Sequence, residues 1–205
     1  AFGHTPSRTA VDYNFDVWVA NRGINDNTTY GMPSATKIAN DPSDCIDRNG
    51  NKVIDTSADR DGDGKITVDC DGDGQPDTLA TTCTVATLVG KKPEFLGDDD
   101  EFILFTVNYG AVGDLGRSIC LDGGTSVGAS NAWVGTYRHP TKNRFFKIGP
   151  QGALNGPYEL NAGHNVYGCV VDKYKILWST NIGGNLTYLN TLNPTQVGPN
   201  LTPPW

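Results

Sequence analysis

Short apolar stretches alternate with turn residues along much of the chain, and one arrangement of three stretches occurs three times. In each copy the first stretch ends in Asp, the second carries a central Trp, and the third is more amphipathic. The copies occupy residues 3–39, 116–149 and 163–190. Their Asp and Trp residues are, in order, Asp12 and Trp18, Asp122 and Trp133, and Asp172 and Trp178. Apolar runs of this length, bounded by turn residues, predict β-strands.

A fourth strand is predicted at two further places, residues 80–88 and 101–109. The run Glu-Phe-Ile-Leu-Phe-Thr-Val-Asn-Tyr at 101–109 is the most apolar in the chain, so we expect a buried central strand there. The composition, with 25 Gly, 12 Pro and 1 Met in 205 residues, also favours strands and turns over helices. We therefore expect an all-β fold.

Short strands that recur as a module are typical of propeller blades, which are small antiparallel sheets packed around a common axis. The Val-Asp, Trp-Val and Gly-His elements of the repeat resemble a bacterial propeller family that includes virginiamycin B lyase and NHL-like proteins. The resemblance covers about half of the chain and implies propeller-like antiparallel blades. The sequence predicts about three such blades in a single domain over residues 1–205, with an insertion at 41–83.

Three blades do not close a ring, because propellers typically have about four to eight. An open array leaves unpaired strand edges and exposed apolar faces. We therefore expect either a piece of a longer chain or several copies that complete one another. The polar tail, residues 192–205, is expected either to reach a neighbouring copy or to be a disordered end.

The resemblance to the lyases implies a His and a Glu that act together with a bound metal. The candidates here are His164 or His139 with Glu159, but no second His-rich blade supports them, so we do not expect an enzyme. His4 and His164 precede equivalent strands and are expected to be turn residues bonded to the neighbouring blade. The recurring Trp residues are expected to pack between blades rather than to bind sugars.

The insertion has oxygen-bearing side chains at every second position, with Gly between or just after them. Calcium takes about six to eight oxygen ligands, so the backbone must curl until these groups converge. Gly64 and Gly74 stand at the sixth position of loops that begin at Asp59 and Asp69, where an EF-hand loop turns sharply. The candidate ligands for two or three calcium ions are Asp47, Asn49, Asn51, Asp55, Asp59, Asp61, Asp63, Asp69, Asp71, Asp73 and Asp77.

This stretch resembles thrombospondin type 3 calcium repeats and, more loosely, dockerin and EF-hand loops. It departs from the EF-hand in lacking a Glu at position 12 and flanking helical patterns. Residues 41–77 contain eleven Asp and four basic residues, a balance of −7 that equals the formal charge of the whole chain. Without cations these carboxylates would repel one another. The alternative is a solvated acidic linker.

Five cysteines are present. Cys45, Cys70 and Cys83 bracket the calcium stretch, and we expect at least one disulfide among them. Cys120 and Cys169 lie on equivalent strands but differ by one position in the repeat. Because adjacent strand positions face opposite sides of a sheet, their pairing is the less favoured one. A zinc site is disfavoured because the chain has no Cys-x-x-Cys pair.

Disulfides and millimolar calcium both belong outside the cytosol. The chain begins at Ala1 without Met, as a secreted protein does once its signal peptide is removed. An acidic chain without a basic stripe is not expected to bind nucleic acid, and no apolar run is long enough to predict a transmembrane segment. The acidic run at 98–101 is read as a solvated turn, with capping of a calcium site as the alternative.

These patterns predict an extracellular, calcium-binding structural protein that self-associates as a filament, surface-layer or matrix subunit. One alternative is a ligand-binding or lyase-type enzyme module of a larger propeller. Another is an adhesin that binds a glycan or a protein through its blade loops. Three glycosylation sequons, which begin at Asn27, Asn185 and Asn200, are a weak further signal.

Overall fold

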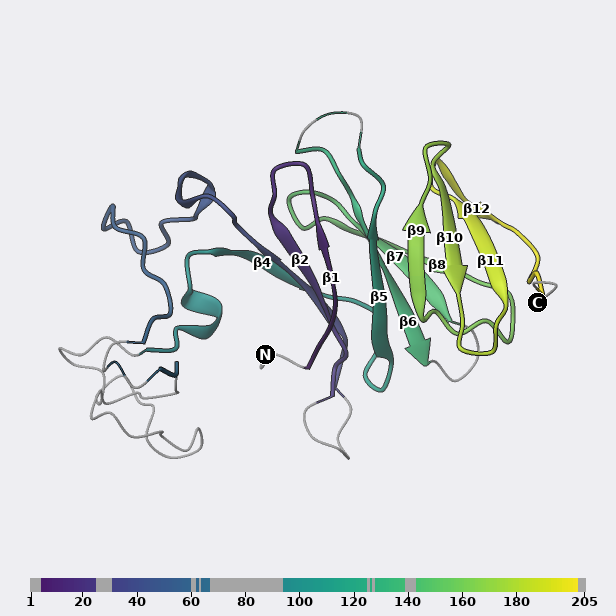
Figure 1. Cartoon of the computed structure of the whole chain (residues 1–205), viewed down its shortest axis with the longest axis horizontal. Coiled ribbons are helices and arrows are strands. Elements are labelled where there is room, and N and C mark those ends of the chain that lie inside the picture. The colour runs from purple at the N-terminus through teal and green to yellow at the C-terminus, as the bar shows by residue number, and fades with distance from the viewer. Residues whose placement is uncertain are drawn as a thin grey trace. The chain divides into compact units, whose positions relative to one another are not determined.

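The computed structural model describes residues 5–24, 31–59, 62, 64–66, 94–124, 126, 128–138 and 143–202. Within these ranges the chain forms three four-stranded antiparallel sheets, each built from four strands that follow one another in sequence (Figure 1). The prediction of an all-β fold is confirmed. None of the described helices is long and apolar enough to cross a membrane.

The twelve strands of the described part are short. The first sheet contains β1 (Pro6–Val11), β2 (Val17–Asn21), β3 (Ser34–Ile38) and β4 (Ile103–Asn108). The second contains β5 (Leu115–Leu121), β6 (Ala132–Arg138), β7 (Arg144–Ile148) and β8 (Leu154–Glu159). The third contains β9 (Gly168–Val171), β10 (Ile176–Thr180), β11 (Leu186–Asn190) and β12 (Asn193–Val197).

The chain divides into two compact units. One comprises Ala1–Asn40 and Phe105–Trp205 and holds the sheets, and the other is Asp41–Leu104. The second unit begins where the insertion is predicted and extends further along the chain. Its regular elements within the described residues are two 3₁₀ turns, η1 (Pro42–Asp44) and η2 (Gly97–Asp99), and the start of β4.

Two apolar layers hold the three sheets together. In the first layer Trp18 and Ala20 of β2 pack with Val134 of β6, and in the second Trp133 of β6 packs with Leu177 of β10. All five side chains are fully buried. The first strands of the sheets are neighbours, since β1 contacts β5 and β5 contacts β9. Trp18 and Trp133 therefore pack between sheets, as the repeat predicts.

The Asp and Trp of each repeat are joined by a hydrogen bond. The indole N–H donates to the Asp Oδ2 at 3.1 Å in the Asp12–Trp18 pair, 3.3 Å in the Asp122–Trp133 pair and 3.0 Å in the Asp172–Trp178 pair. In every case the other carboxylate oxygen accepts two backbone N–H groups of the turn that follows. The Asp thus closes the hairpin and orients the Trp, which explains why each first strand ends in Asp.

These hydrogen bonds change the acidity of two of the aspartates. Burial opposes ionisation of Asp122, but hydrogen bonds from Asn131, Gly124 and Trp133 outweigh it, so the Asp122 pKa is lowered. The Trp178 N–H is the main cause of the lowered pKa of Asp172. Both groups stabilise the fold above the usual Asp pKa, and this contribution is lost as the pH falls through their lowered values.

The strand at 101–109 differs from its prediction. The structure has β4 there, but β4 is an edge strand of the first sheet and most of its residues are only partly buried. Its apolar run arises because Phe105 and Val107 pack on the first core while Ile103 and Leu104 are also partly covered. The prediction of a buried central strand is therefore wrong. The other candidate, residues 80–88, lies outside the described residues.

The C-terminal tail is part of the third sheet. Residues 193–197 form β12, which pairs with β11, and Leu201 exchanges backbone hydrogen bonds with Leu186 at 2.7 and 2.8 Å. The expectation of a disordered end is therefore wrong for residues 192–202, whereas contact of the tail with a neighbouring copy stays a prediction. The strand is held by its backbone ladder, since its sequence Asn-Pro-Thr-Gln-Val has no apolar alternation.

A disulfide joins Cys120 of β5 to Cys169 of β9, with Cα atoms 5.8 Å apart. The sequence-based preference against this pair is wrong. Cys120 is opposite Trp133 in its sheet and Cys169 is opposite Ser179, so the two do lie on opposite faces of equivalent sheets. Because neighbouring sheets pack face to face, opposite faces are the ones that meet. The one-residue offset therefore brings the two sulfurs together.

His164 is fully buried. Its ring Nε2 lies 2.9 Å from Ser179 Oγ of β10, and its backbone oxygen accepts a hydrogen bond from the Asn143 side chain at 3.1 Å. The side chain thus bonds within its own sheet, and only the backbone bonds to the neighbouring sheet, in part contrary to prediction. His4 lies outside the described residues.

Acidification is expected to destabilise the fold between about pH 6.5 and pH 4 because of His164. Burial lowers its pKa to about 4, whereas His in an unfolded chain titrates near 6.5. In this window the unfolded chain binds a proton that the folded chain does not, so the free energy of unfolding falls as the pH falls. Urea unfolding should show a loss of about 2 kcal/mol between about pH 7 and 4.5. A His164→Asn variant should lose markedly less, and equal losses would contradict this assignment.

Candidate metal site

Residues 47–55 form a tight loop around the Asp47 carboxylate. Asp47 Oδ1 accepts hydrogen bonds from the backbone N–H of Gly50 at 2.7 Å and of Asn51 at 3.2 Å. Its Oδ2 accepts the N–H of Lys52 at 2.9 Å. Lys52 has φ 63°, a left-handed conformation at the sixth position of the loop, where an EF-hand loop has Gly. The chain therefore curls around its first acidic residue, as a calcium loop requires.

The other predicted ligands of this loop join the same cluster. Asp55 Oδ2 accepts hydrogen bonds from the side-chain amides of Asn49 and Asn51, both at 2.8 Å. The Oδ1 atom of Asn49 accepts the N–H of Asn51 at 2.9 Å, and that of Asn51 accepts the N–H of Val53 at 2.7 Å. Carboxylate and amide oxygens have more than one lone pair, so these contacts leave acceptor capacity for a cation.

A second loop starts at Asp59 in the same way. Asp59 Oδ1 accepts the N–H of Gly62 at 2.7 Å, and Oδ2 accepts the N–H of Gly64 at 2.8 Å. Gly64, at the sixth position, has φ 84°, a conformation that is costly for any residue but Gly. The fourth and sixth N–H groups therefore bond to the first Asp in both loops, although the two sequences differ.

Six of the predicted ligands lie outside the described residues: Asp61, Asp63, Asp69, Asp71, Asp73 and Asp77. In the part of the chain that the structure describes, no group of three or more His, Cys, Asp or Glu side chains is placed to hold a metal ion. The first loop contributes two carboxylates and two amides. Amide oxygens are suitable ligands for Ca²⁺ but for few softer metals, so this donor set fits calcium best.

The acidic run at 98–101 anchors the first loop. Glu101 is 1% exposed, and its Oε1 and Oε2 accept the N–H groups of Arg48 at 2.9 Å and Asp55 at 2.8 Å. Asp100 Oδ2 accepts the N–H of Ser57 at 2.9 Å. The Arg48 guanidinium donates in return to the backbone oxygens of Asp100 and Ile103. The solvated-turn interpretation is therefore wrong for Asp100 and Glu101.

The anchor also sets the acidity of its neighbours. Burial opposes ionisation of Asp100, but hydrogen bonds from Ser57, Phe102 and Thr56 outweigh it and lower its pKa. Burial raises the pKa of the Cys45 thiol, and the negative charges of Asp100 and Glu101 raise it further. Cys45 is free rather than disulfide-bonded. A disulfide among Cys45, Cys70 and Cys83 thus stays a prediction for Cys70 and Cys83, which lie outside the described residues.

Replacing Glu101 by Ala is expected to loosen the first loop. The change leaves the N–H groups of Arg48 and Asp55 without their acceptors, which should cost about 2–3 kcal/mol. Hydrogen exchange at these two amides should accelerate by about 30-fold or more. Asp99→Ala is the matched control, because Asp99 is an exposed residue of the same turn. If both variants exchange at the same rate, the anchoring role is refuted.

The catalytic candidates find little support in the geometry. His164 is completely buried against Ser179, so its imidazole has no access to a substrate, and His139 lies outside the described residues. Glu159 is the exposed last residue of β8. The described residues therefore give no support to a catalytic role for His164 or Glu159, and the role of His139 stays untested.

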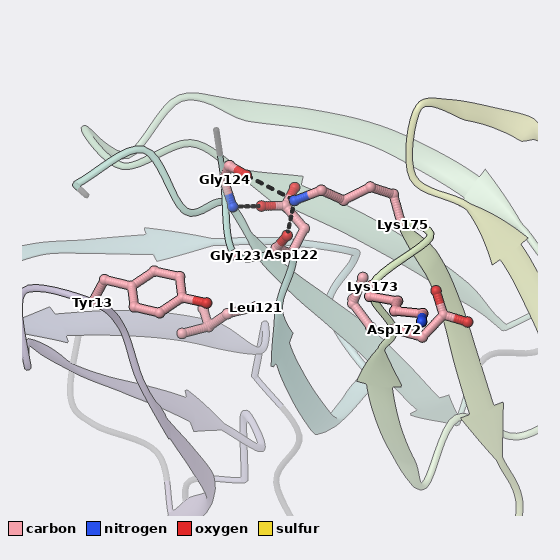
Figure 2. A pocket seen from close by; sticks show the side chains of 9 residues that line it. Tyr13, Leu121, Asp122, Gly123, Gly124, Asp172, Lys173 and Lys175 are labelled. Atoms are coloured by element: carbon pink, nitrogen blue, oxygen red, sulfur yellow. Dashed lines mark hydrogen bonds between the residues drawn. The ribbon is translucent and has the colours of Figure 1, made fainter. Parts of the chain in front are cut away.

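A shallow pocket of about 470 Å³ lies where the turns after the first strands meet. Tyr13, Gly123 and Lys173, each directly after a repeated Asp, are among its lining residues. Figure 2 shows Lys175 reaching across to the turn after β5, where its Nζ donates to the backbone oxygens of Asp122 at 2.6 Å and Gly124 at 2.7 Å. This lysine ties the second and third sheets together at their turns.

No known protein family and no curated protein matches this chain.

Proposed function

We propose that this protein is an extracellular structural protein that self-associates through the faces of its sheets and binds calcium in its insertion. One observation carries the proposal. Trp18 and Trp133 are fully buried between sheets, whereas Trp178, at the same position of the third sheet, is only partly buried and the paired residue Val170 is 60% exposed. In the described part of the chain no further sheet packs on the Trp178 face, and exposed apolar faces of this kind mark association surfaces.

The calcium half of the proposal rests on the two loops that begin at Asp47 and Asp59. Both have their fourth and sixth N–H groups bonded to the first carboxylate, and the first loop collects four oxygen-bearing side chains. In these loops Ca²⁺ would neutralise the carboxylates and fix the loop shape. The site is a rigidifying one, because the loop is tied by Glu101 to the end of its own unit.

The extracellular location is supported by the disulfide and by the calcium loops. The Cys120–Cys169 disulfide suits an oxidising compartment, and weak calcium loops fill only where calcium is millimolar. A filament, surface-layer or matrix subunit combines these features, since such proteins need repeated contacts and cation-stiffened segments.

Sizing by sedimentation velocity, with calcium and with chelator, tests the proposal. We expect species larger than the monomer that grow with concentration and that shrink or loosen when calcium is removed. Isothermal calorimetry should show calcium uptake that falls in an Asp47→Asn/Asp59→Asn variant and is unchanged in the control Asp99→Asn. A monodisperse monomer at high concentration in both conditions would refute self-association, and absence of uptake at millimolar calcium would refute the calcium site.

A further inference from the structure

Each sheet has one face that carries the repeated Trp and one face that does not. The Trp18 face of the first sheet is covered by the second sheet, and the Trp133 face of the second sheet is covered by the third. Within the sheet unit the covering surface is always the Trp-free face of the following sheet. The Trp178 face of the third sheet and the Trp-free face of the first sheet are the two surfaces for which this series provides no cover.

Strand register identifies which residues are equivalent on the Trp-free faces. Ala132 and Ile148 are paired in the second sheet, Leu177 and Leu189 in the third, and Val17 and Ile38 in the first. The first two pairs are fully buried beneath the preceding Trp face. Val17 and Ile38 are apolar as well but only partly buried. The first sheet thus keeps the apolar character of a covering surface.

The geometry points to a head-to-tail contact in which the Trp178 face of one copy packs on the Trp-free face of the first sheet of a second copy. This inference rests on the proposed self-association and specifies its surfaces. A second copy is the occupant because it supplies, at equivalent positions, the same surface that covers Trp18 and Trp133 within one chain. The contact would continue an arrangement already present twice in the sheet unit.

The Trp178 face is suited to such a contact. In each sheet the Trp is paired with a residue of the strand that follows it. This residue is Lys37 in the first sheet and Lys147 in the second, but it is Tyr188 in the third sheet. The Trp178 and Tyr188 rings are 5.3 Å apart, so this face carries an aromatic pair in place of the Trp–Lys pair of the other two sheets. Aromatic side chains are enriched at protein interfaces and bury much area for little lost entropy.

The Cys120–Cys169 disulfide gives the contact a register that can be tested. Cys120 is opposite Trp133, and Cys169 is one residue before the position opposite the next Trp. In a contact between copies, Val170 is the equivalent of Cys120, because it is opposite Trp178. Thr9 is the equivalent of Cys169, because it is one residue before Ala10, the residue opposite Trp18. Cysteines at 170 of one copy and 9 of another should therefore meet as Cys120 and Cys169 do.

Disulfide trapping between two separately purified variants tests the contact. Thr9→Cys and Val170→Cys, each in a Cys45→Ser background, are mixed and oxidised mildly, and the linked peptides are identified by mass spectrometry. We expect a linked pair of chains joined through positions 9 and 170 in at least tenfold excess over a control mixture. The control replaces Thr9→Cys by Val112→Cys, a 72% exposed position in the turn before β5.

The outcomes separate this inference from the proposed function. Self-association with no more 9–170 linkage than in the control overturns the contact and leaves self-association standing. A monomer in all mixtures overturns both. If the thiol of monomeric Val170→Cys is blocked from a maleimide, another part of the same chain covers the Trp178 face, and the inference is wrong. Linkage with closed dimers would indicate a ring of two copies, and linkage with growing oligomers a filament, both of which use the proposed contact.

Discussion

Replacing Lys37 by Met is expected to destabilise the sheet unit by about 3–5 kcal/mol, because it removes one partner of a buried ion cluster. Lys37 is 4% exposed, and its Nζ lies 3.1 Å from Asp12 Oδ2 and 2.9 Å from Asp16 Oδ2. Both carboxylates are buried too. Met keeps the length and packing of the side chain but leaves the two carboxylates facing each other without a cation. Urea unfolding at neutral pH should show a clearly lower midpoint.

The second repeat offers a matched control for this change. Lys147 occupies the position of Lys37, since each is paired with the Trp of its sheet. Its Nζ lies 5.9 Å from the centre of the Trp133 ring, but it is more exposed, and the Asp of its repeat is bonded to Asn131 and Trp133. Lys147→Met should therefore cost less than about 1 kcal/mol. Equal losses in the two variants would show that Lys37 acts by packing and not by charge.

The repeated sequence patterns are the ones that predicted the strands and their pairing correctly. A strand that ends in Asp and a strand that centres on Trp occur three times, and each pair forms the hairpin that its spacing predicts. The fourth strands of the second and third sheets, β8 and β12, were not predicted. Their sequences are Leu-Asn-Gly-Pro-Tyr-Glu and Asn-Pro-Thr-Gln-Val, and edge strands of this kind are held by backbone hydrogen bonds that leave no apolar pattern.

Long-range pairings were the other part that the sequence could not reveal. The burial of Lys37 depends on two aspartates of a neighbouring hairpin, and no local pattern distinguishes it from the more exposed Lys147. The disulfide depends on which faces of two sheets meet, which strand alternation alone does not determine. Once face-to-face packing is assumed, the one-residue offset between Cys120 and Cys169 becomes an argument for the bond.

The sequence predicted that the candidate ligands of the first loop lie together, but it did not predict the contacts of Glu101 that hold this loop in place. Alternating oxygen-bearing residues with Gly after them indicate a curled loop, and Asp47, Asn49, Asn51 and Asp55 do lie together. Glu101 is far along the chain from this loop, and the acidic run that contains it looks solvated. A signal was nevertheless present, because Glu101 is the first residue of the most apolar run of the chain, and acidic residues that are buried with such a run are paired.

Replacing both Cys120 and Cys169 by Ser is expected to lower the free energy of unfolding by about 4 kcal/mol. The bond closes a loop with a sequence separation of 49, and the loss of chain entropy that such a cross-link imposes on the unfolded state gives a value of this size. The bond also fastens β9 to β5, so the third sheet should be the part that loosens first. Chemical unfolding of the double variant tests the prediction, with Cys45→Ser as the control that should change stability by less than about 0.5 kcal/mol.

Hydrogen exchange of the double variant then shows which sheet is destabilised. Amides of β9 and β10 should lose protection before those of β2, because Trp18 packs on the second sheet and does not depend on the third. Uniform loss across all three sheets would mean that they unfold as one cooperative block, and a double variant as stable as the parent would refute the stabilising role of the bond.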